Sequence, residues 1–154
     1  MADFDLAIIG GGPAGSAAAI TAARSGACVA LFESRQFPRH KVCGEFVSAE
    51  ALDLLRDLLA DATDIHRLLD QAPVLAHTRL WLGERMVQAA VSPPAVSITR
   101  FDLDAALWRA AQAAGVTCRN SCEVSSIDGA GPCQLRTARG IRQRVPRPGQ
   151  PTTR

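Results

Sequence analysis

The hydrophobic pattern divides the first 33 residues into three segments. Residues 4–9 (FDLAII) are an apolar run that stops at three consecutive glycines. Residues 13–25 are rich in alanine, with proline at the start and Gly26 just past the end, and residues 28–32 (CVALF) are a second apolar run closed by Glu33. These features predict a buried strand, a helix of about three turns and a second strand. Together the segments have the length of one βαβ unit.

A loop and one amphipathic helix are predicted next. Residues 34–46 show no clean period and read as a loop, after which Ser48 is placed to cap a helix that ends near residue 59. Leu52, Leu55 and Leu59 fall on one face of that helix. Residues 61–71 predict a further helical turn or two.

The middle of the chain predicts a β-hairpin followed by a helix. Residues 74–82 and 86–91 have the composition of strands joined near Gly83 and Glu84, and Pro93 and Pro94 are predicted to end the hairpin. Apolar positions then return to helical spacing over residues 102–114. Two short strands are predicted after this helix, over residues 116–119 and 122–128.

Charge separates the end of the chain from the rest. The formal net charge is +2, but the last 21 residues hold six arginines and no acid, which leaves −4 on residues 1–133. A mildly acidic body argues against nucleic acid as the main partner. The arginine- and proline-rich end has no periodic apolar face, so residues 134–154 are predicted to be a disordered tail behind one domain formed by residues 1–133.

Composition argues against several other classes of protein. No stretch approaches the roughly 20 apolar residues of a membrane span, and no charged region precedes the first apolar run, so we expect a cytoplasmic protein. Peripheral contact with a membrane stays open. The five cysteines and three histidines lack the spacing of a zinc site or a disulfide framework, and we therefore expect no metal.

The glycines after the first strand carry the clearest chemical signal. Gly10, Gly12 and Gly15 have G-x-G-x-x-G spacing. In such a loop the first glycine permits the tight turn, the second lets the backbone approach a pyrophosphate, and the third lets the helix pack on the sheet. The free amides at the helix start then face the phosphates. A glycine-rich turn in an ordinary α/β domain is the competing interpretation.

The acid at the end of the second strand supports nucleotide binding. Glu33 lies 18 residues beyond Gly15, where a carboxylate accepts hydrogen bonds from an adenosine ribose and repels a 2′-phosphate. The strand, the glycine loop, the helix and the acidic residue thus all indicate a nucleotide-binding site. The βαβ physics is the same for FAD and NAD, so it does not choose between them.

Three strings resemble one flavoprotein family in order along the chain. GGGPAGSAAAI (residues 10–20) resembles the FAD-binding start of the p-hydroxybenzoate hydroxylase superfamily. FPRHKVCGEFVSAEAL (residues 37–52) resembles geranylgeranyl reductase-like and flavin-dependent halogenase-like members. ITRFDLDAALWRAAQAAGV (residues 98–116) is similar to a family segment with an arginine at the head of a helix beside the cofactor.

This resemblance implies an α/β fold: a Rossmann-like FAD-binding βαβ unit with an inserted β-hairpin, incomplete relative to full-length relatives. It implies roles for Arg100 near the pyrophosphate or ribitol, for the backbone of Val124 at the adenine, and for Arg39 and Lys41 in the loop near the pyrophosphate and flavin. Arg100 has an alternative role as a partner of Asp102 or Asp104. The cofactor-binding residues expected in all are Gly10, Gly12, Pro13, Ala14, Gly15, Glu33, Ser34, Arg39, Lys41, Arg100 and Val124.

The function that the resemblance implies is that of an FAD-dependent oxidoreductase. NAD(P)H would reduce the flavin, which would act on a small organic substrate as a reductase or a monooxygenase. The string KVCGE (residues 41–45) favours the reductase-like branch, and no catalytic residue is assigned. The later flavin and substrate segments of the family do not follow in this sequence, so we expect a truncated fragment. A non-catalytic nucleotide-binding module or an inactive gene fragment is the alternative, and the oligomeric state is not predicted.

Overall fold

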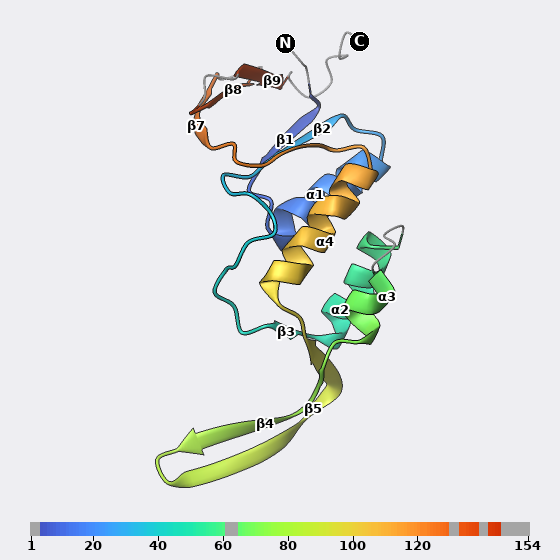
Figure 1. The fold of residues 1–154 in the computed structure, drawn as a ribbon, viewed down its shortest axis with the longest axis vertical. Helices are drawn as coiled ribbons and strands as arrows, with labels where there is room; N and C mark the ends of the chain where they lie inside the picture. The colour runs from blue at the N-terminus through green and yellow to red at the C-terminus, as the bar shows by residue number, and fades with distance from the viewer. Residues whose placement is uncertain (1–3, 61–64, 130–132, 139–141, 146–154) are drawn as a thin grey trace.

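The computed structural model describes residues 4–60, 65–129, 133–138 and 142–145. Its strands form three small sheets, and its helices pack between and beside these sheets (Figure 1). None of the helices in these ranges has the length and hydropathy of a membrane span. In chain order the elements are β1 (Leu6–Ile9), α1 (Pro13–Arg24), β2 (Val29–Phe32), β3 (Phe46–Val47), α2 (Ala49–Leu58), α3 (Ile65–Asp70), β4 (Val74–Leu82), β5 (Arg85–Ser97), α4 (Arg100–Ala113), β6 (Thr117–Arg119), β7 (Val124–Asp128), β8 (Cys133–Thr137) and β9 (Arg142–Val145).

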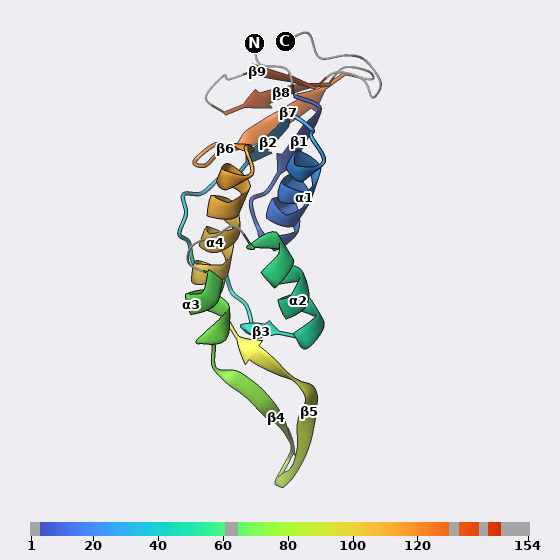
Figure 2. The same cartoon turned by 90° about the vertical axis from the view of Figure 1, so that its right-hand side faces the viewer.

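A parallel sheet in the order β1-β2-β6 forms the centre of the fold. Every residue of β2 is buried because the strand is covered on both faces and paired on both edges. Val29 and Leu31 pack toward α1 and α4, whereas Ala30 and Phe32 pack toward the sheet β7-β8-β9. Figures 1 and 2 show the two helices side by side on one face of this sheet and the antiparallel sheet on the other. The predicted βαβ unit and the mixed α/β class are thereby confirmed.

The helices begin and end where local chemistry stops them. Gly12 is the N-cap of α1, Pro13 occupies its first turn, and Gly26 follows its end with φ +91°. Ser48 caps α2 as predicted, its hydroxyl accepting a hydrogen bond from the amide of Ala51 at 3.3 Å. Thr99 caps α4 in the same way through the amide of Asp102, so this helix starts two residues before the predicted position.

The hairpin β4–β5 extends away from the rest of the molecule (Figures 1 and 2). The sequence prediction ended the second strand at the prolines, but β5 continues through Pro93 and Pro94 to Ser97. The pairing explains this difference: the register jumps from His77↔Ala90 to Leu75↔Ala95. The prolines therefore lie in a bulge, where no regular ladder hydrogen bond requires their missing amides. After the bulge, β5 pairs with the short strand β3.

The structure also differs from the predicted disordered tail. Residues 133–137 and 142–145 form β8 and β9, which pair with each other and with β7. Leu135 is 3% exposed and packs with Phe4 and Phe32 on the outer face of the parallel sheet. Disorder is predicted from the arginines and prolines of this region, whereas the burial of Leu135 is a tertiary contact that composition does not reveal. The remainder of the predicted tail, residues 139–141 and 146–154, lies outside the described residues, and the domain boundary at residue 133 stays a prediction.

Candidate nucleotide-binding site

The glycine loop joins β1 to α1 and is held by hydrogen bonds on both sides. Gly10 has φ +104°, a conformation that favours glycine, and its amide donates to the carbonyl of Phe32 at 2.7 Å. The amide of Gly11 donates to Glu33 Oε2 at 3.0 Å, and its carbonyl accepts the Ser16 hydroxyl at 3.1 Å. The loop is thus fixed to the end of β2 and to the first turn of α1.

Two glycines of the loop are packed too tightly for any side chain. A Cβ on Gly15 would lie 1.9 Å from the carbonyl oxygen of Gly10, and a Cβ on Gly11 would lie 2.6 Å from the Trp108 ring. The Gly15 contact agrees with the packing role predicted from the glycine spacing, and the positive φ of Gly10 agrees with its turn role. Binding of a cofactor by these glycines stays a prediction. Gly11 was not among the predicted residues. Its partner Trp108 is 97 positions away, so no local pattern indicates the contact.

Gly12 differs from its neighbours because the space beside it is open. A Cβ there would meet only the ends of two arginine side chains, Arg100 Nη2 at 3.5 Å and Arg39 Nη2 at 4.0 Å. Glycine also leaves the start of α1 without a side-chain cap. The helix amides and both guanidinium groups therefore converge on the same small region beside Gly12.

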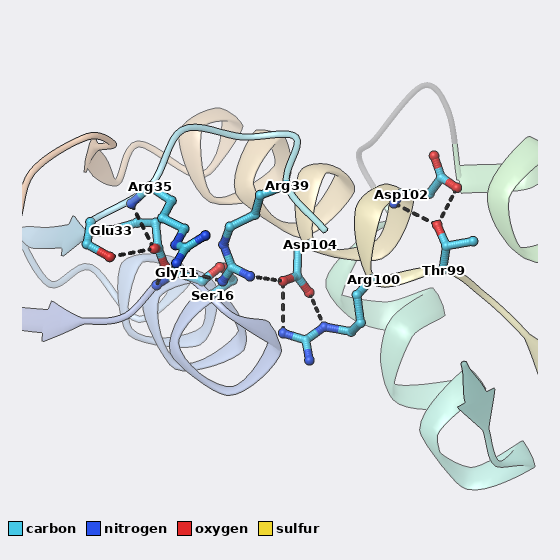
Figure 3. Close-up of polar contacts among 10 residues, drawn as sticks. Gly11, Ser16, Glu33, Arg35, Arg39, Thr99, Arg100, Asp102 and Asp104 are labelled. Carbon is cyan, nitrogen blue, oxygen red and sulfur yellow. Dashed lines mark hydrogen bonds and ion pairs between the residues drawn. The ribbon is translucent and has the colours of Figure 1, made fainter. Parts of the chain in front are cut away.

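Glu33 occupies the end of β2 and turns its carboxylate toward the glycine loop (Figure 3). The residue is 7% exposed. Burial by itself raises the pKa of Glu33, but the amides of Arg35 and Gly11, the charge of Arg39 and the Ser34 hydroxyl together hold the pKa below its ordinary value of 4.5. The predicted residue Ser34 thus contributes to the site through Glu33.

A buried aspartate connects the two arginines (Figure 3). Asp104, on α4, is fully buried and accepts two hydrogen bonds from Arg100, at 2.7 Å from Nε and 2.8 Å from Nη2. Its Oδ2 also lies 3.4 Å from Arg39 Nη1, while Arg39 Nη2 lies 3.3 Å from Glu33 Oε2. The pairing of Arg100 with Asp104, weighed from sequence as an alternative to cofactor binding, is observed. It leaves Arg100 beside Gly12, so the two roles are compatible.

One atom of this cluster has no partner. Arg39 is 9% exposed at its side chain, and its Nε is buried without a hydrogen bond. A buried, unsatisfied donor next to a cation pair and a helix start is the arrangement that an anionic ligand would complete. Hydrogen bonding to Asp104 raises the pKa of Arg100 more than burial lowers it, and the Cys43 thiol adds a smaller rise. The guanidinium group of Arg100 is therefore held in the charged form.

The remaining predicted residues lie in different settings. Lys41 is exposed in the loop after β2, outside the cluster of Glu33, Arg39, Asp104 and Arg100. Val124 begins β7 and packs near the buried Phe32 side of the sheet. The part assigned to its backbone depends on a ligand and stays a prediction. Asp104, like Gly11, was missed as a site residue because only the fold brings it to the loop.

A cavity of about 580 Å³ lies outside this cluster. It is bounded by Pro38, by the region between α3 and β4, and by Asp102, Ala105 and Arg109 on α4. Asp104 and Trp108 point from α4 toward the glycine loop instead. The helix thus separates the cavity from the site, and no residue of the glycine loop lines it.

The fold and the site define a Rossmann-like βαβ unit with two arginines beside the start of its first helix. Comparisons with known proteins agree. Residues 5–39 match the family model described as FAD dependent oxidoreductase. Menaquinone reductase of Mycolicibacterium smegmatis is 46% identical over 54 residues, which are 35% of this chain and 13% of that protein. The 1H-pyrrole-2-carbonyl-[peptidyl-carrier protein] brominase of Pseudoalteromonas luteoviolacea is 33% identical over 114 residues, which are 73% of this chain and 27% of that protein.

Solved structures show the same fold over nearly the whole chain. The myxobacterial chondrochloren halogenase CndH superposes with a TM-score of 0.77 at 24% identity, covering 96% of this chain and 36% of that one. Halogenase PltM in complex with phloroglucinol and FAD superposes with a TM-score of 0.75 at 22% identity, covering 93% and 33%. The chain therefore corresponds to the N-terminal FAD-binding part of an FAD-dependent oxidoreductase related to flavin halogenases and menaquinone reductases, and spans about a third of these structures.

Proposed function

We propose that this chain binds FAD through its ADP half. Glu33 would accept the ribose hydroxyls, and the amides at the start of α1 together with Arg39 and Arg100 would hold the diphosphate. The observation that carries the proposal is the set of donors around Gly12: two guanidinium groups converge there, and one of them has a buried Nε without a partner. A diphosphate supplies the acceptors and negative charge that these donors lack.

The finer proposal is that the chain is the cofactor-binding part of an oxidoreductase. Reduced by NAD(P)H, the flavin would supply the redox chemistry on a small organic substrate, as a reductase or a monooxygenase. In this proposal the described residues bind and orient the cofactor, and none of them is assigned a catalytic role. The support is the relation to menaquinone reductase and the halogenases.

A second candidate is a nucleotide-binding module without catalysis. It is favoured by one observation: the residues that match the FAD dependent oxidoreductase model are residues 5–39, which hold the glycine loop and Glu33. Both candidates require the same ADP-binding site. They differ in whether a bound flavin is reduced by NAD(P)H.

The experiment separates binding from turnover. The full chain is incubated with FAD, dialysed and examined by absorbance, and NADPH or NADH is then added without oxygen. Retained flavin at one equivalent, with loss of the oxidised absorbance after addition, supports the oxidoreductase. Retained flavin that stays oxidised supports the module. Failure to retain FAD, together with failure to bind ADP in calorimetry, refutes both. Asp53→Asn, at an exposed pair on α2, is the control variant that keeps binding.

A further inference from the structure

The carboxylate of Glu33 is already saturated with donors. Oε1 accepts hydrogen bonds from the Ser34 hydroxyl at 3.2 Å and the Arg35 amide at 3.0 Å. Oε2 accepts hydrogen bonds from the Gly11 amide at 3.0 Å and from Arg39 Nη2 at 3.3 Å. A carboxylate offers about four lone-pair positions. A ribose that binds Glu33 therefore has to displace one of these donors.

Arg39 is the donor best placed to leave. The two amides belong to backbone that the fold fixes, and Gly11 is wedged against Trp108. The two side-chain bonds are the longer ones, and of these only Arg39 has other places for its donors. It keeps Asp104 at 3.4 Å, its Nε is unpaired, and its Nη2 lies 4.0 Å from the position a Gly12 Cβ would occupy.

The charges around Arg39 decide which ligands favour that exchange. A nucleoside that takes Glu33 removes a charge-assisted hydrogen bond from a buried guanidinium and returns nothing to it, which is costly. A nucleotide with a diphosphate returns an anion at the helix start, within reach of both arginines. The exchange is therefore unfavourable for the sugar alone and favourable for the sugar with a diphosphate.

We propose that Arg39 is a specificity-determining residue that exchanges Glu33 for the diphosphate of the ligand, and so selects dinucleotides and nucleoside diphosphates over nucleosides. Asp104 positions the guanidinium during this exchange by holding it next to Arg100. The inference rests on the proposed function, because it assumes that the glycine loop binds an adenosine diphosphate group. It adds that Glu33 is masked until such a ligand arrives.

The test compares adenosine with ADP. Calorimetry on the full chain measures both dissociation constants for the unmodified protein, for Arg39→Met and for Arg56→Met, which removes an exposed arginine on α2. Arg39→Met is expected to bind ADP about tenfold or more weaker, the factor for losing one charge-assisted hydrogen bond. Its affinity for adenosine is expected to stay the same or rise. Arg56→Met is expected to match the unmodified protein with both ligands.

A second measurement uses the unmodified protein, so it does not depend on whether a variant folds. Inorganic pyrophosphate is added to the labelled, unmodified chain, and the Arg39 Nε–H resonance is followed by NMR, where we expect a shift on binding. An equal loss of adenosine and ADP affinity in Arg39→Met, or an Arg39 Nε–H that does not respond to pyrophosphate, overturns the exchange. An unmodified protein that binds neither ADP nor FAD instead refutes the proposed function, so the two failures are distinguishable.

Discussion

Gly15→Ala tests whether the close approach of α1 to β1 is a steric requirement. The added Cβ would lie 1.9 Å from the carbonyl oxygen of Gly10, 3.1 Å from its carbonyl carbon and 3.3 Å from Ile8 Cγ2. Real Cβ contacts essentially never fall under 3.0 Å, so the helix and the loop must part by about 1 Å. The obstacle is backbone and has no rotamer to change. We therefore expect a cost of about 3 kcal/mol, the upper part of the range for overpacking.

Thermal unfolding followed by circular dichroism measures this cost. For a chain of this size, about 3 kcal/mol corresponds to a fall in Tm of roughly 6–12 °C. Gly12→Ala is the matched control, because its Cβ would have no atom closer than 3.5 Å and its backbone, at φ −73°, suits any residue. We expect Gly12→Ala to change stability by less than about 1 kcal/mol. A Gly15→Ala variant as stable as the unmodified protein, or an equal loss in both variants, would refute the reasoning.

Three further outcomes are expected. Asp104→Asn leaves the guanidinium groups of Arg39 and Arg100, whose side chains are 9% and 18% exposed, without their shared buried anion. It should therefore lower the free energy of unfolding by about 3 kcal/mol in urea titration, and an unchanged midpoint contradicts this. The lowered pKa of Glu33 contributes stability that is complete above about 4.5 and disappears as pH falls through the folded-state pKa. The stability difference between the protein and Glu33→Gln should therefore shrink in that acid range, and a constant difference would count against it. Burial raises the pKa of Cys118 to about 11, so mass spectrometry at neutral pH should find exposed Cys43 alkylated long before Cys118; equal rates would falsify this.

The sequence predicts the elements whose signals are local. Pro13 and Gly26 mark the ends of α1, and Ser48 marks the start of α2, because caps act within one turn of helix. The glycine spacing likewise identifies the loop. Thr99 and Asp102 carry the same kind of signal at the start of α4, but the prediction began that helix two residues late.

The rest depends on contacts between distant residues. Asp104 lies 65 positions from Arg39, and Trp108 lies 97 positions from Gly11. Helical periodicity places both residues on α4 but does not say that this face meets the glycine loop. Leu135 is a second kind of example. It is buried against Phe32 in a region where composition alone predicts disorder, and this contact cannot be read from the local sequence.

The central claim is that the glycine loop and Glu33 bind the ADP half of the cofactor. Competition for bound FAD tests it most directly, with ADP, FMN and riboflavin as the competitors. We predict that ADP displaces FAD from a single class of site, whereas FMN and riboflavin, which lack the adenosine, do so far less effectively. Displacement by FMN at the same concentrations as ADP would contradict the claim.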